Sequence, residues 1–343
     1  IRVPEFRKNF AASRIVNIVS YFFSAIAATF RVEHQDYVFT ISQPPILGGM
    51  LGVIGKHLKH AKLIYNIQDF NPEQIKAVEF TNNRIILNTM MLLDKHSCKV
   101  ADKVIVVGRD MANTLQKRFP GKMLSYAYIN NWINEKEIYP LPKDNEGVRN
   151  FCRKYGLEDK FVIMYSGNIG LYYDLPNLLK LIAEFKMEKS VVFAFIGQGS
   201  VLEELKEYQK QQKMENVVFI PYQEKKNLIY SLNAGDVHFV VNAKGIKGVS
   251  VPSKLYGVMA AGKPVLGILE KESEARLIVE EAECGKVVSP EEYEAIKALI
   301  ADFIRLKNDE MLIKMGENGR KYLTDNLTKD VSIKKYREEI LSC

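Results

Sequence analysis

The sequence is poor in the residues that build metal and disulfide centres. Its 343 residues include only four cysteines, five histidines and one tryptophan. The cysteines, Cys98, Cys152, Cys284 and Cys343, are too scattered for a disulfide framework or a zinc site, which indicates a reducing compartment. The histidines do not cluster at zinc-ligand spacing, and no Asp-x-Asp pair is present to hold a metal-bound diphosphate. We therefore expect no metal and no other cofactor.

Several motifs that mark other classes of protein are also missing. The sequence has no Walker A lysine loop, no nucleophile elbow and no signal peptide. Its most apolar stretch, residues 15–30, lies between Arg14 and Arg31 and is shorter than the roughly 20 residues of a membrane span. This stretch predicts either a buried core helix or an interfacial helix. We expect a cytoplasmic protein that contacts the inner face of the membrane peripherally, if at all.

The start of the chain also lacks expected features. It begins at Ile1, without a methionine and without the strand and Gly-rich turn that usually open a Rossmann domain. We expect the first domain to be truncated at its N-terminus.

Positive charge is concentrated in the first part of the chain. Residues 1–134 contain 17 Lys and Arg against 9 Asp and Glu, whereas the remainder has 31 against 32, so the net charge of +7 arises in the first part. Such an excess suits an anionic partner, such as a membrane surface, a phosphorylated acceptor or nucleic acid. A solvated basic surface without a partner explains the charge equally well.

Short apolar runs alternate with helical patterns along the chain, which predicts parallel sheets covered on both faces. The predicted strands are residues 37–42, 63–68, 104–108, 124–129, 161–167, 191–197, 217–222, 236–242, 264–269 and 285–288. The predicted helices are residues 47–58, 84–99, 110–118, 175–185, 201–212, 225–234, 253–261, 274–284, 291–306, 310–324 and 329–341.

This rhythm predicts an α/β fold of two doubly wound, Rossmann-like domains with a cleft between them. We assign residues 1–134 to the first domain, 135–150 to a linker rich in proline and polar residues, and 151–325 to the second domain. Residues 326–343 form a final helix. Ligands of such sheets bind beyond the carboxyl ends of the strands, so we expect the site residues in the loops that follow the strands.

The loop and helix at residues 244–265 are the most informative segment. Gly248 permits close backbone approach, Ser250 and Ser253 are candidate helix caps, and Lys254 adds a positive charge in the first turn. Free amides at a helix start attract anions. We expect an anion site here, although an ordinary loop with an exposed lysine fits the same residues.

Four further loops carry candidate site residues. Gly167, Asn168 and Gly170 follow one predicted strand, and Gly197 follows the next. In the first domain, Asp69 and Glu73 end a strand, where a carboxylate can orient or deprotonate a hydroxyl. The alternative for Asp69 is that it caps a turn. Gln43 lies in another strand-to-helix turn, SQPP.

The combination of motifs resembles the group 1 glycosyltransferases, which are retaining enzymes of the GT-B fold. The segment from Val251 to Val265 reads VPSKLYGVMAAGKPV and follows AGDVH. Other matching pieces are YSGNIG at residues 165–170, NVVF at 216–219, QDFNPE at 68–73 and NNWI at 130–133. The resemblance covers essentially the whole chain, and the branch it suggests builds bacterial O-antigen, capsule and other exopolysaccharides.

The resemblance implies a nucleotide-sugar donor, often UDP-linked, bound by the second half of the chain. Lys254 would neutralise the leaving diphosphate as a catalytic group, together with the amides near Ser253. The donor-binding set would comprise Gly167, Asn168, Gly170, Gly197, Tyr222, Ser250, Val251 and Ser253. Asp69 would face the acceptor as a catalytic group, with Gln43 and Glu73 beside it, and the final helix would return to the first domain.

The implied reaction is retaining transfer of a hexose or N-acetylhexosamine derivative to a lipid-linked or saccharide acceptor. The resemblance implies no metal and no nucleic-acid partner.

The sequence departs from the family at several places, and Val249 stands at the position of the first glutamate of the usual pair. Gly257 stands where many members have a ribose-binding glutamate, for which Glu274 is a candidate substitute. Asn168 stands where many have an arginine. Two alternatives stay open. One is another GT-B enzyme, such as a sugar-nucleotide 2-epimerase. The other is a non-catalytic nucleotide-sugar binding subunit, which the missing glutamates and the missing N-terminal Gly-rich turn suggest.

Overall fold

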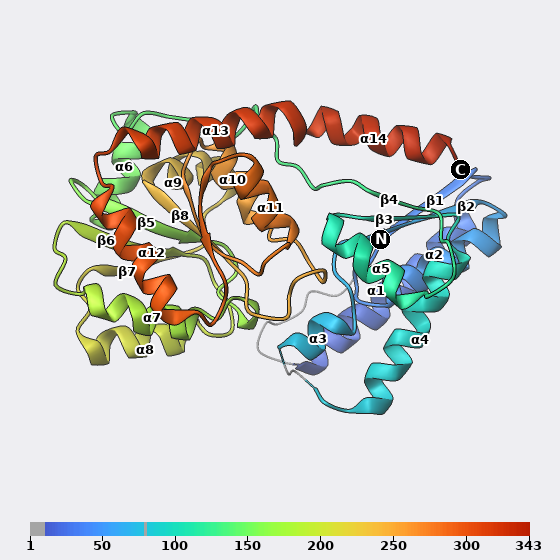
Figure 1. The fold of residues 1–343 in the computed structure, drawn as a ribbon. Helices are drawn as coiled ribbons and strands as arrows, with labels where there is room; N and C mark the ends of the chain where they lie inside the picture. The colour runs from blue at the N-terminus through green and yellow to red at the C-terminus, as the bar shows by residue number, and fades with distance from the viewer. Residues whose placement is uncertain (1–10, 79–80) are drawn as a thin grey trace. The chain divides into compact units, whose positions relative to one another are not determined.

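The computed structural model describes residues 11–78 and 81–343, and the chain forms two compact units (Figure 1). Unit 1 comprises Ile1–Asn130, Gly248–Val251 and Lys334–Cys343, and unit 2 comprises Asn131–Lys247 and Pro252–Ile333. The expected linker at 135–150 is thus grouped with unit 2. Of the apolar stretch at 15–30, the side chain of Ile15 lies outside the described residues.

Unit 1 contains a four-stranded sheet in the order β1-β2-β3-β4, in which all neighbouring pairs are parallel. Its strands are β1 (Tyr37–Ile41), β2 (Lys62–Ile67), β3 (Lys103–Val106) and β4 (Tyr126–Tyr128). Its helices are α1 (Ala11–Arg31), α2 (Leu47–Lys59), α3 (Glu73–Ala77), α4 (Arg84–Val100) and α5 (Arg109–Arg118). Helices α1 and α4 both pack against α2.

Unit 2 contains a six-stranded parallel sheet in the order β10-β9-β8-β5-β6-β7. Its strands are β5 (Phe161–Ser166), β6 (Val191–Ile196), β7 (Val217–Ile220), β8 (Val237–Val241), β9 (Val265–Ile268) and β10 (Gly285–Val288). The chain proceeds from β5 outward to β7, returns to β8 beside β5, and then proceeds outward to β10. The sheet is therefore doubly wound, with its switch point between β5 and β8.

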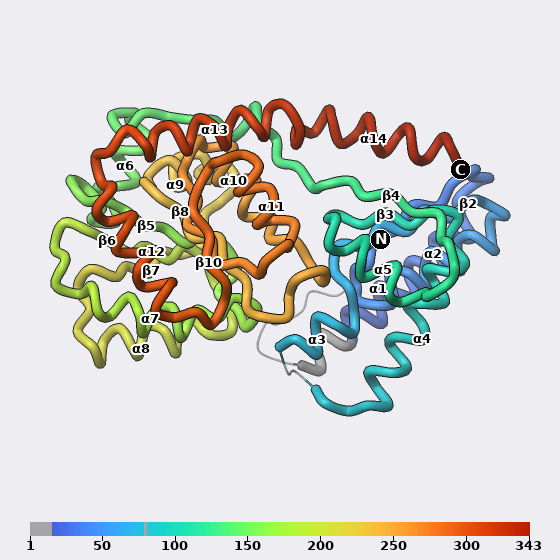
Figure 2. The backbone as a smooth tube through the Cα atoms, viewed as in Figure 1, coloured from blue at the N-terminus to red at the C-terminus, as the bar shows by residue number. Residues whose placement is uncertain are grey.

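Helices cover both faces of this sheet. They are α6 (Glu146–Tyr155), α7 (Leu175–Ile182), α8 (Leu202–Gln212), α9 (Leu228–Ala234), α10 (Lys254–Ala260), α11 (Glu274–Glu281), α12 (Tyr293–Arg305) and α13 (Glu310–Asn326). Short 3-10 turns are η1 (Leu171–Tyr173), η2 (Ala183–Phe185) and η3 (Lys225–Asn227). After β10 the chain continues through α12 and α13 into α14 (Lys329–Leu341), whose last residues belong to unit 1 (Figure 2).

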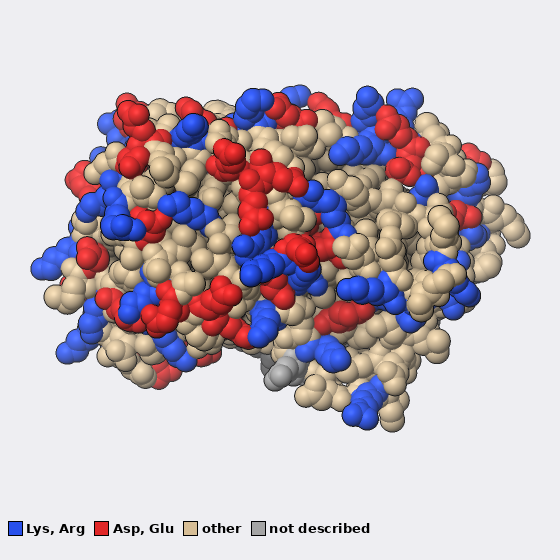
Figure 3. Space-filling view, viewed as in Figure 1, with Lys and Arg blue, Asp and Glu red and all other residues tan. Residues whose placement is uncertain are grey.

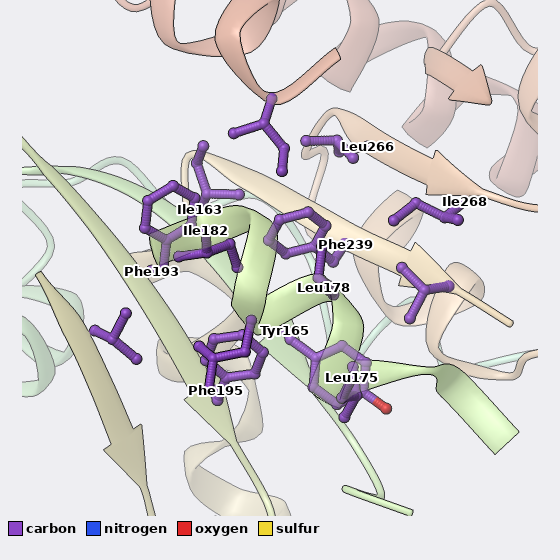
Figure 4. Close-up of a cluster of buried hydrophobic side chains, with 14 of the residues drawn as sticks. Ile163, Tyr165, Leu175, Leu178, Ile182, Phe193, Phe195, Phe239, Leu266 and Ile268 are labelled. Atoms are coloured by element: carbon purple, nitrogen blue, oxygen red, sulfur yellow. The ribbon is translucent and has the colours of Figure 1, made fainter. Parts of the chain in front are cut away.

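Each face of the unit 2 sheet has its own apolar core. One cluster joins the strands to α7, α8 and α12, and the other joins them to α6 and α9. The first cluster includes Tyr165, Phe193, Phe195 and Phe239, whose side chains point into one continuous layer (Figure 4). Burial on both faces explains the almost uninterrupted apolar strands, of which β6 is buried throughout.

One helix begins inside residues 135–150, which were predicted to be a linker. Helix α6 begins at Glu146, and the side chain of Asn145 accepts hydrogen bonds from the backbone N–H groups of Gly147 and Val148. This capping satisfies N–H groups that the first turn leaves unpaired. The polar composition that suggested a linker therefore includes a helix start.

Candidate functional site

A pocket of about 360 Å³ lies within unit 2, beyond the carboxyl ends of its central strands. Ser166 and Gly167 approach it from the end of β5, Tyr222 from the loop after β7, and Ser253 and Lys254 from the start of α10. The switch point between β5 and β8 lies at this pocket, where ligands of doubly wound sheets bind. The volume of the pocket is that of a small-molecule site.

Two glycine loops pack closely at one side of the pocket. A β-carbon at Gly197 would lie 1.9 Å from the carbonyl oxygen of Gly167, and one at Gly199 would lie 2.0 Å from that of Ile169. Backbone bonds join the loops as well, because Ile169 N–H donates to the Gln198 carbonyl at 3.0 Å. Gly167 itself has φ +152°, which suits glycine. The loops after β5 and β6 therefore form one unit of backbone.

Lys254 lies beside these loops and is held by two tyrosines. Its Nζ donates to the hydroxyl oxygen of Tyr165 at 2.9 Å, and lies 3.5 Å from the ring centroid of Tyr173 and 4.4 Å from that of Tyr165. Burial lowers the pKa of Lys254 well below its ordinary value, while the ring faces favour the ammonium form. Within the described part of the chain, Lys254 forms no ion pair.

The charges in the pocket wall favour an anionic ligand. Lys225 and Lys254 line the pocket, and none of the described residues that line it is Asp or Glu. Lys225 forms an ion pair with Glu137 at 2.7 Å, which offsets its positive charge. The positive charge of Lys254 has no such carboxylate partner among the described residues. A diphosphate carries the complementary charge.

The pocket lining also includes apolar residues and one buried imidazole. Ile133, Leu232 and Gly257 line the pocket. His238 lines it too, with Nε2 2.9 Å from the Leu232 carbonyl oxygen, and burial lowers its pKa to about 3. Because the carbonyl only accepts, Nε2 carries the proton of a neutral ring. These residues suit a ring-shaped, uncharged part of a ligand.

The pocket brings together only part of the predicted donor-binding set. Five of its members line the pocket: Gly167, Asn168, Tyr222, Ser253 and Lys254. Gly197 does not line the pocket but packs against the Gly167 carbonyl. Buried Gly170 does not line the pocket, and neither does Glu274, which is 1% exposed at the start of α11. Ser250 and Val251 belong to unit 1.

A second polar cluster lies in unit 1 around Asp69. Gln43 and Gln74 donate side-chain hydrogen bonds to its carboxylate at 3.1 and 3.2 Å, and Ser250 also bonds to it. Burial raises the pKa of Asp69, although these hydrogen bonds oppose the rise. The segment that bears Ser250 is fixed by Phe70, whose N–H donates to the Val249 carbonyl at 2.8 Å. A carboxylate of raised pKa can accept a proton from a hydroxyl.

Glu73 lies on α3 in unit 1 and binds Arg118, the last residue of α5. Arg118 Nε donates to Glu73 Oε1 at 2.8 Å, and its other nitrogens bond to the second Glu73 oxygen and to Asp94. Tyr65 donates to the free oxygen of Asp94 at 2.6 Å. The Arg118 side chain is 4% exposed. This arrangement ties α3, α4 and α5 to β2.

Three residues of this site were not predicted from the sequence: Tyr165, Tyr173 and Lys225. Tyr165 begins the YSGNIG motif, and Tyr173 lies eight residues after Tyr165. Their contact with Lys254 depends on the tertiary fold. The aromatic residues flanking a glycine-rich loop were the available signal.

Comparisons with known proteins agree with this geometry. The family described as glycosyl transferases group 1 matches residues 149–322, about half of the chain. The probable glycosyltransferase WbjE of Pseudomonas aeruginosa is 28% identical over 98% of this chain and 82% of its own length. The putative colanic acid biosynthesis glycosyl transferase WcaI of Escherichia coli is 25% identical over 82% of this chain and 68% of its own length.

Solved structures confirm the predicted fold class. Anabaena Alr3699/HepE, solved in complex with UDP, has a TM-score of 0.75 at 14% identity, covering 96% of this chain and 84% of that one. At this identity the likeness concerns the fold, which is GT-B with two parallel-sheet α/β units. Together with the family match, this shows that the chain belongs to the group 1 family of glycosyl transferases.

Proposed function

We propose that this glycosyltransferase moves a hexose or N-acetylhexosamine derivative from a UDP-type nucleotide sugar to a lipid-linked or saccharide acceptor. The observation that carries the proposal is the unit 2 pocket, whose lining combines several apolar residues with a lysine that forms no ion pair among the described residues. A UDP group has the matching chemistry, with a diphosphate joined to a flat ring. The HepE complex with UDP supports the choice of nucleotide, and the name of WcaI supports a role in bacterial polysaccharide synthesis.

We propose that transfer retains the anomeric configuration. The bond between the anomeric carbon and the β-phosphate oxygen breaks, and the acceptor oxygen attacks from the same face. The acceptor proton passes to the departing phosphate oxygen, and Lys254 stabilises the negative charge that develops there. Fixed donors of this kind act strongly in a site that excludes water.

The acceptor side of the proposal rests on unit 1. Asp69 would orient the acceptor hydroxyl, and Gln43 would hold the Asp69 carboxylate in place through the bond between them. Glu73 would support this region indirectly, because both its carboxylate oxygens bind Arg118.

We propose that the diphosphate charge is balanced by protein groups. Among residues 11–78 and 81–343, no group of three or more His, Cys, Asp or Glu side chains is arranged to hold a metal ion. Transfer should therefore continue in excess EDTA. Loss of transfer in EDTA, restored by a divalent cation, would contradict this part of the proposal.

We also propose peripheral contact with an anionic membrane through unit 1. Exposed apolar side chains lie on α1 and on α4, including Phe23 at 65%, Ile85 at 78% and Leu92 at 70% exposure. Few acidic side chains appear around α4 on the face drawn in Figure 3. None of the helices in the described ranges is both long and apolar enough to cross a membrane.

Thermal shift against a panel of nucleotides and nucleotide sugars tests the proposed donor. UDP and a UDP-sugar should raise the melting midpoint more than GDP, CDP or ADP, because ligand binding stabilises the native state. A larger shift with another nucleotide would overturn the choice of UDP.

Incubation with the donor alone separates the alternatives. A transferase leaves the sugar of the donor unchanged, whereas a 2-epimerase inverts its C2 centre without an acceptor. Binding of UDP with no transfer to any lipid-linked or saccharide acceptor would indicate a binding subunit.

A further inference from the structure

We propose that Tyr165 and Tyr173 are positioning residues for Lys254, holding its ammonium group ready for the donor diphosphate. Tyr165 acts through its hydroxyl and Tyr173 through the face of its ring. This inference rests on the proposed function, because it takes the diphosphate to be the partner of Lys254.

The hydrogen bonds around Tyr165 have a defined direction. Its hydroxyl lies 2.6 Å from the Asn168 carbonyl oxygen, which can only accept, so the hydroxyl proton is committed there. The remaining lone pairs of the hydroxyl oxygen can therefore accept from Lys254 Nζ at 2.9 Å. The chain of donors runs from Lys254 through Tyr165 to the loop that carries Asn168, which lines the pocket.

Tyr165 is a rigid anchor. It is fully buried in the core cluster of unit 2 (Figure 4). Its ring lies 6.0 Å from that of Phe195 and 6.1 Å from that of Tyr173. A lysine side chain free in solution samples many rotamers, and ordering it costs entropy. Holding it against a buried ring before the ligand arrives removes much of that cost from the binding step.

The partners of Lys254 are uncharged, so its positive charge stays available to a ligand. A lysine paired with a carboxylate would present no net charge to a diphosphate, and the carboxylate would repel it. The ring faces of two tyrosines and one hydroxyl stabilise an ammonium without neutralising it. An ammonium has three N–H donors, and the Tyr165 hydroxyl takes one of them.

Gly167 lies next to the Lys254 side chain. A β-carbon at Gly167 would lie 3.6 Å from Lys254 Cε, which is an ordinary contact, so the lysine side chain passes beside the glycine. The backbone of the loop after β5 and the cation are thus brought to the same side of the pocket. Oxygen atoms of a diphosphate can contact both.

The test is a double-mutant cycle read by the Kd for UDP, measured calorimetrically on the full chain. Tyr165→Phe removes only the hydroxyl, Tyr173→Leu removes the ring face, and Tyr173→Phe keeps that face as a control. We expect Tyr165→Phe and Tyr173→Leu each to raise the Kd by about 3- to 10-fold. Tyr173→Phe, which keeps the ring face, should raise the Kd less than Tyr173→Leu does.

The same substitutions in the Lys254→Met background separate positioning from a general structural effect. If the tyrosines act through Lys254, Tyr165→Phe should change the Kd of Lys254→Met by less than about twofold, because coupled residues are not additive. An equal effect in both backgrounds would overturn the inference. A Kd that Lys254→Met leaves unchanged would instead overturn the proposed function.

Discussion

Lys254 brings a positive charge into the pocket with no carboxylate beside it, so its own protonation state controls what it offers a ligand. Burial lowers its pKa, and a bound diphosphate would raise that pKa again by favouring the charged form. Binding and proton uptake are therefore linked. At a pH below the lowered pKa the free protein already carries the charge, and above it binding must first recruit a proton.

The affinity for UDP should accordingly fall with rising pH, and should do so below the pH at which an ordinary lysine titrates. Past the lowered pKa, the Kd should rise by about tenfold for each pH unit. Burial raises the pKa of Tyr165, and the pKa of His238 is about 3, so both stay neutral between pH 7.5 and 10. Calorimetry across this range measures the effect.

Lys254→Arg is the control for this pH dependence, because a guanidinium keeps its charge throughout the range. Its affinity should depend less on pH than that of the wild type. Equally flat profiles for the two proteins would show that Lys254 does not lose its proton below pH 10.

Single residues were predictable where their chemistry is local. Gly167, Asn168, Ser253 and Lys254 were chosen because they lie at the ends of predicted strands or begin a predicted helix, and Tyr222 was implied by the family resemblance. All five line one pocket. The tyrosine partners of Lys254 were not predictable in this way. Their contacts depend on how η1 folds back beside β5, which no periodicity in the sequence reports.

Among the elements, the strands of unit 2 follow closely from their sequence. The predicted strand at 191–197 is Val191–Ile196, and the one at 285–288 is Gly285–Val288. Short apolar runs closed by glycine or polar residues define such buried strands well. Strand β4 is shorter than its predicted range of 124–129, because only Tyr126–Tyr128 pair with β3. Sequence pattern does not reveal where ladder pairing stops.

The two glycine loops support a prediction at this scale. Gly197→Ala would place a β-carbon 1.9 Å from the Gly167 carbonyl oxygen, so the loops after β5 and β6 must separate. We expect UDP binding to weaken by at least about tenfold, since the loss of two or more well-placed hydrogen bonds has this size. The melting midpoint should also fall.

Gly257→Ala provides a matched comparison for stability. Its β-carbon would meet Leu232 and Ile133 at 3.4 and 3.7 Å, which is ordinary contact, in a helix that favours alanine. Its melting midpoint should stay level or rise. An unchanged midpoint and an unchanged Kd in Gly197→Ala would show that the loops have more freedom than the structure indicates.

At the scale of the whole molecule, the segment that suggested a donor site is divided between the two units. Gly248–Val251 belongs to unit 1, where the Gly248 N–H donates to Asp110 at 2.8 Å, and the residues from Pro252 onward belong to unit 2. Motifs report the chemistry of this segment but not which unit its loop packs against. That assignment requires tertiary contacts.

The charge of the molecule and the exposed side chains of unit 1 predict binding to anionic vesicles. Sedimentation with phosphatidylglycerol-containing vesicles should exceed sedimentation with neutral ones, and should weaken with salt because screening reduces the attraction. Ile85→Ser combined with Leu92→Ser should reduce it further. Met187→Ser, which alters a 76% exposed side chain of unit 2, is the control. Equal binding to neutral vesicles, or none, would contradict membrane contact.

Sugar transfer by the Lys254→Met variant tests the central claim most directly. The donor is the UDP-sugar that best stabilises the wild type, and Lys210→Met, which alters an exposed lysine of α8, is the control. We expect Lys254→Met to lose about 100-fold or more of the transfer rate, as when a donor to a developing anion is removed, while its melting midpoint stays unchanged. Lys210→Met should be fully active. A Lys254→Met variant that transfers sugar at the wild-type rate would contradict the account.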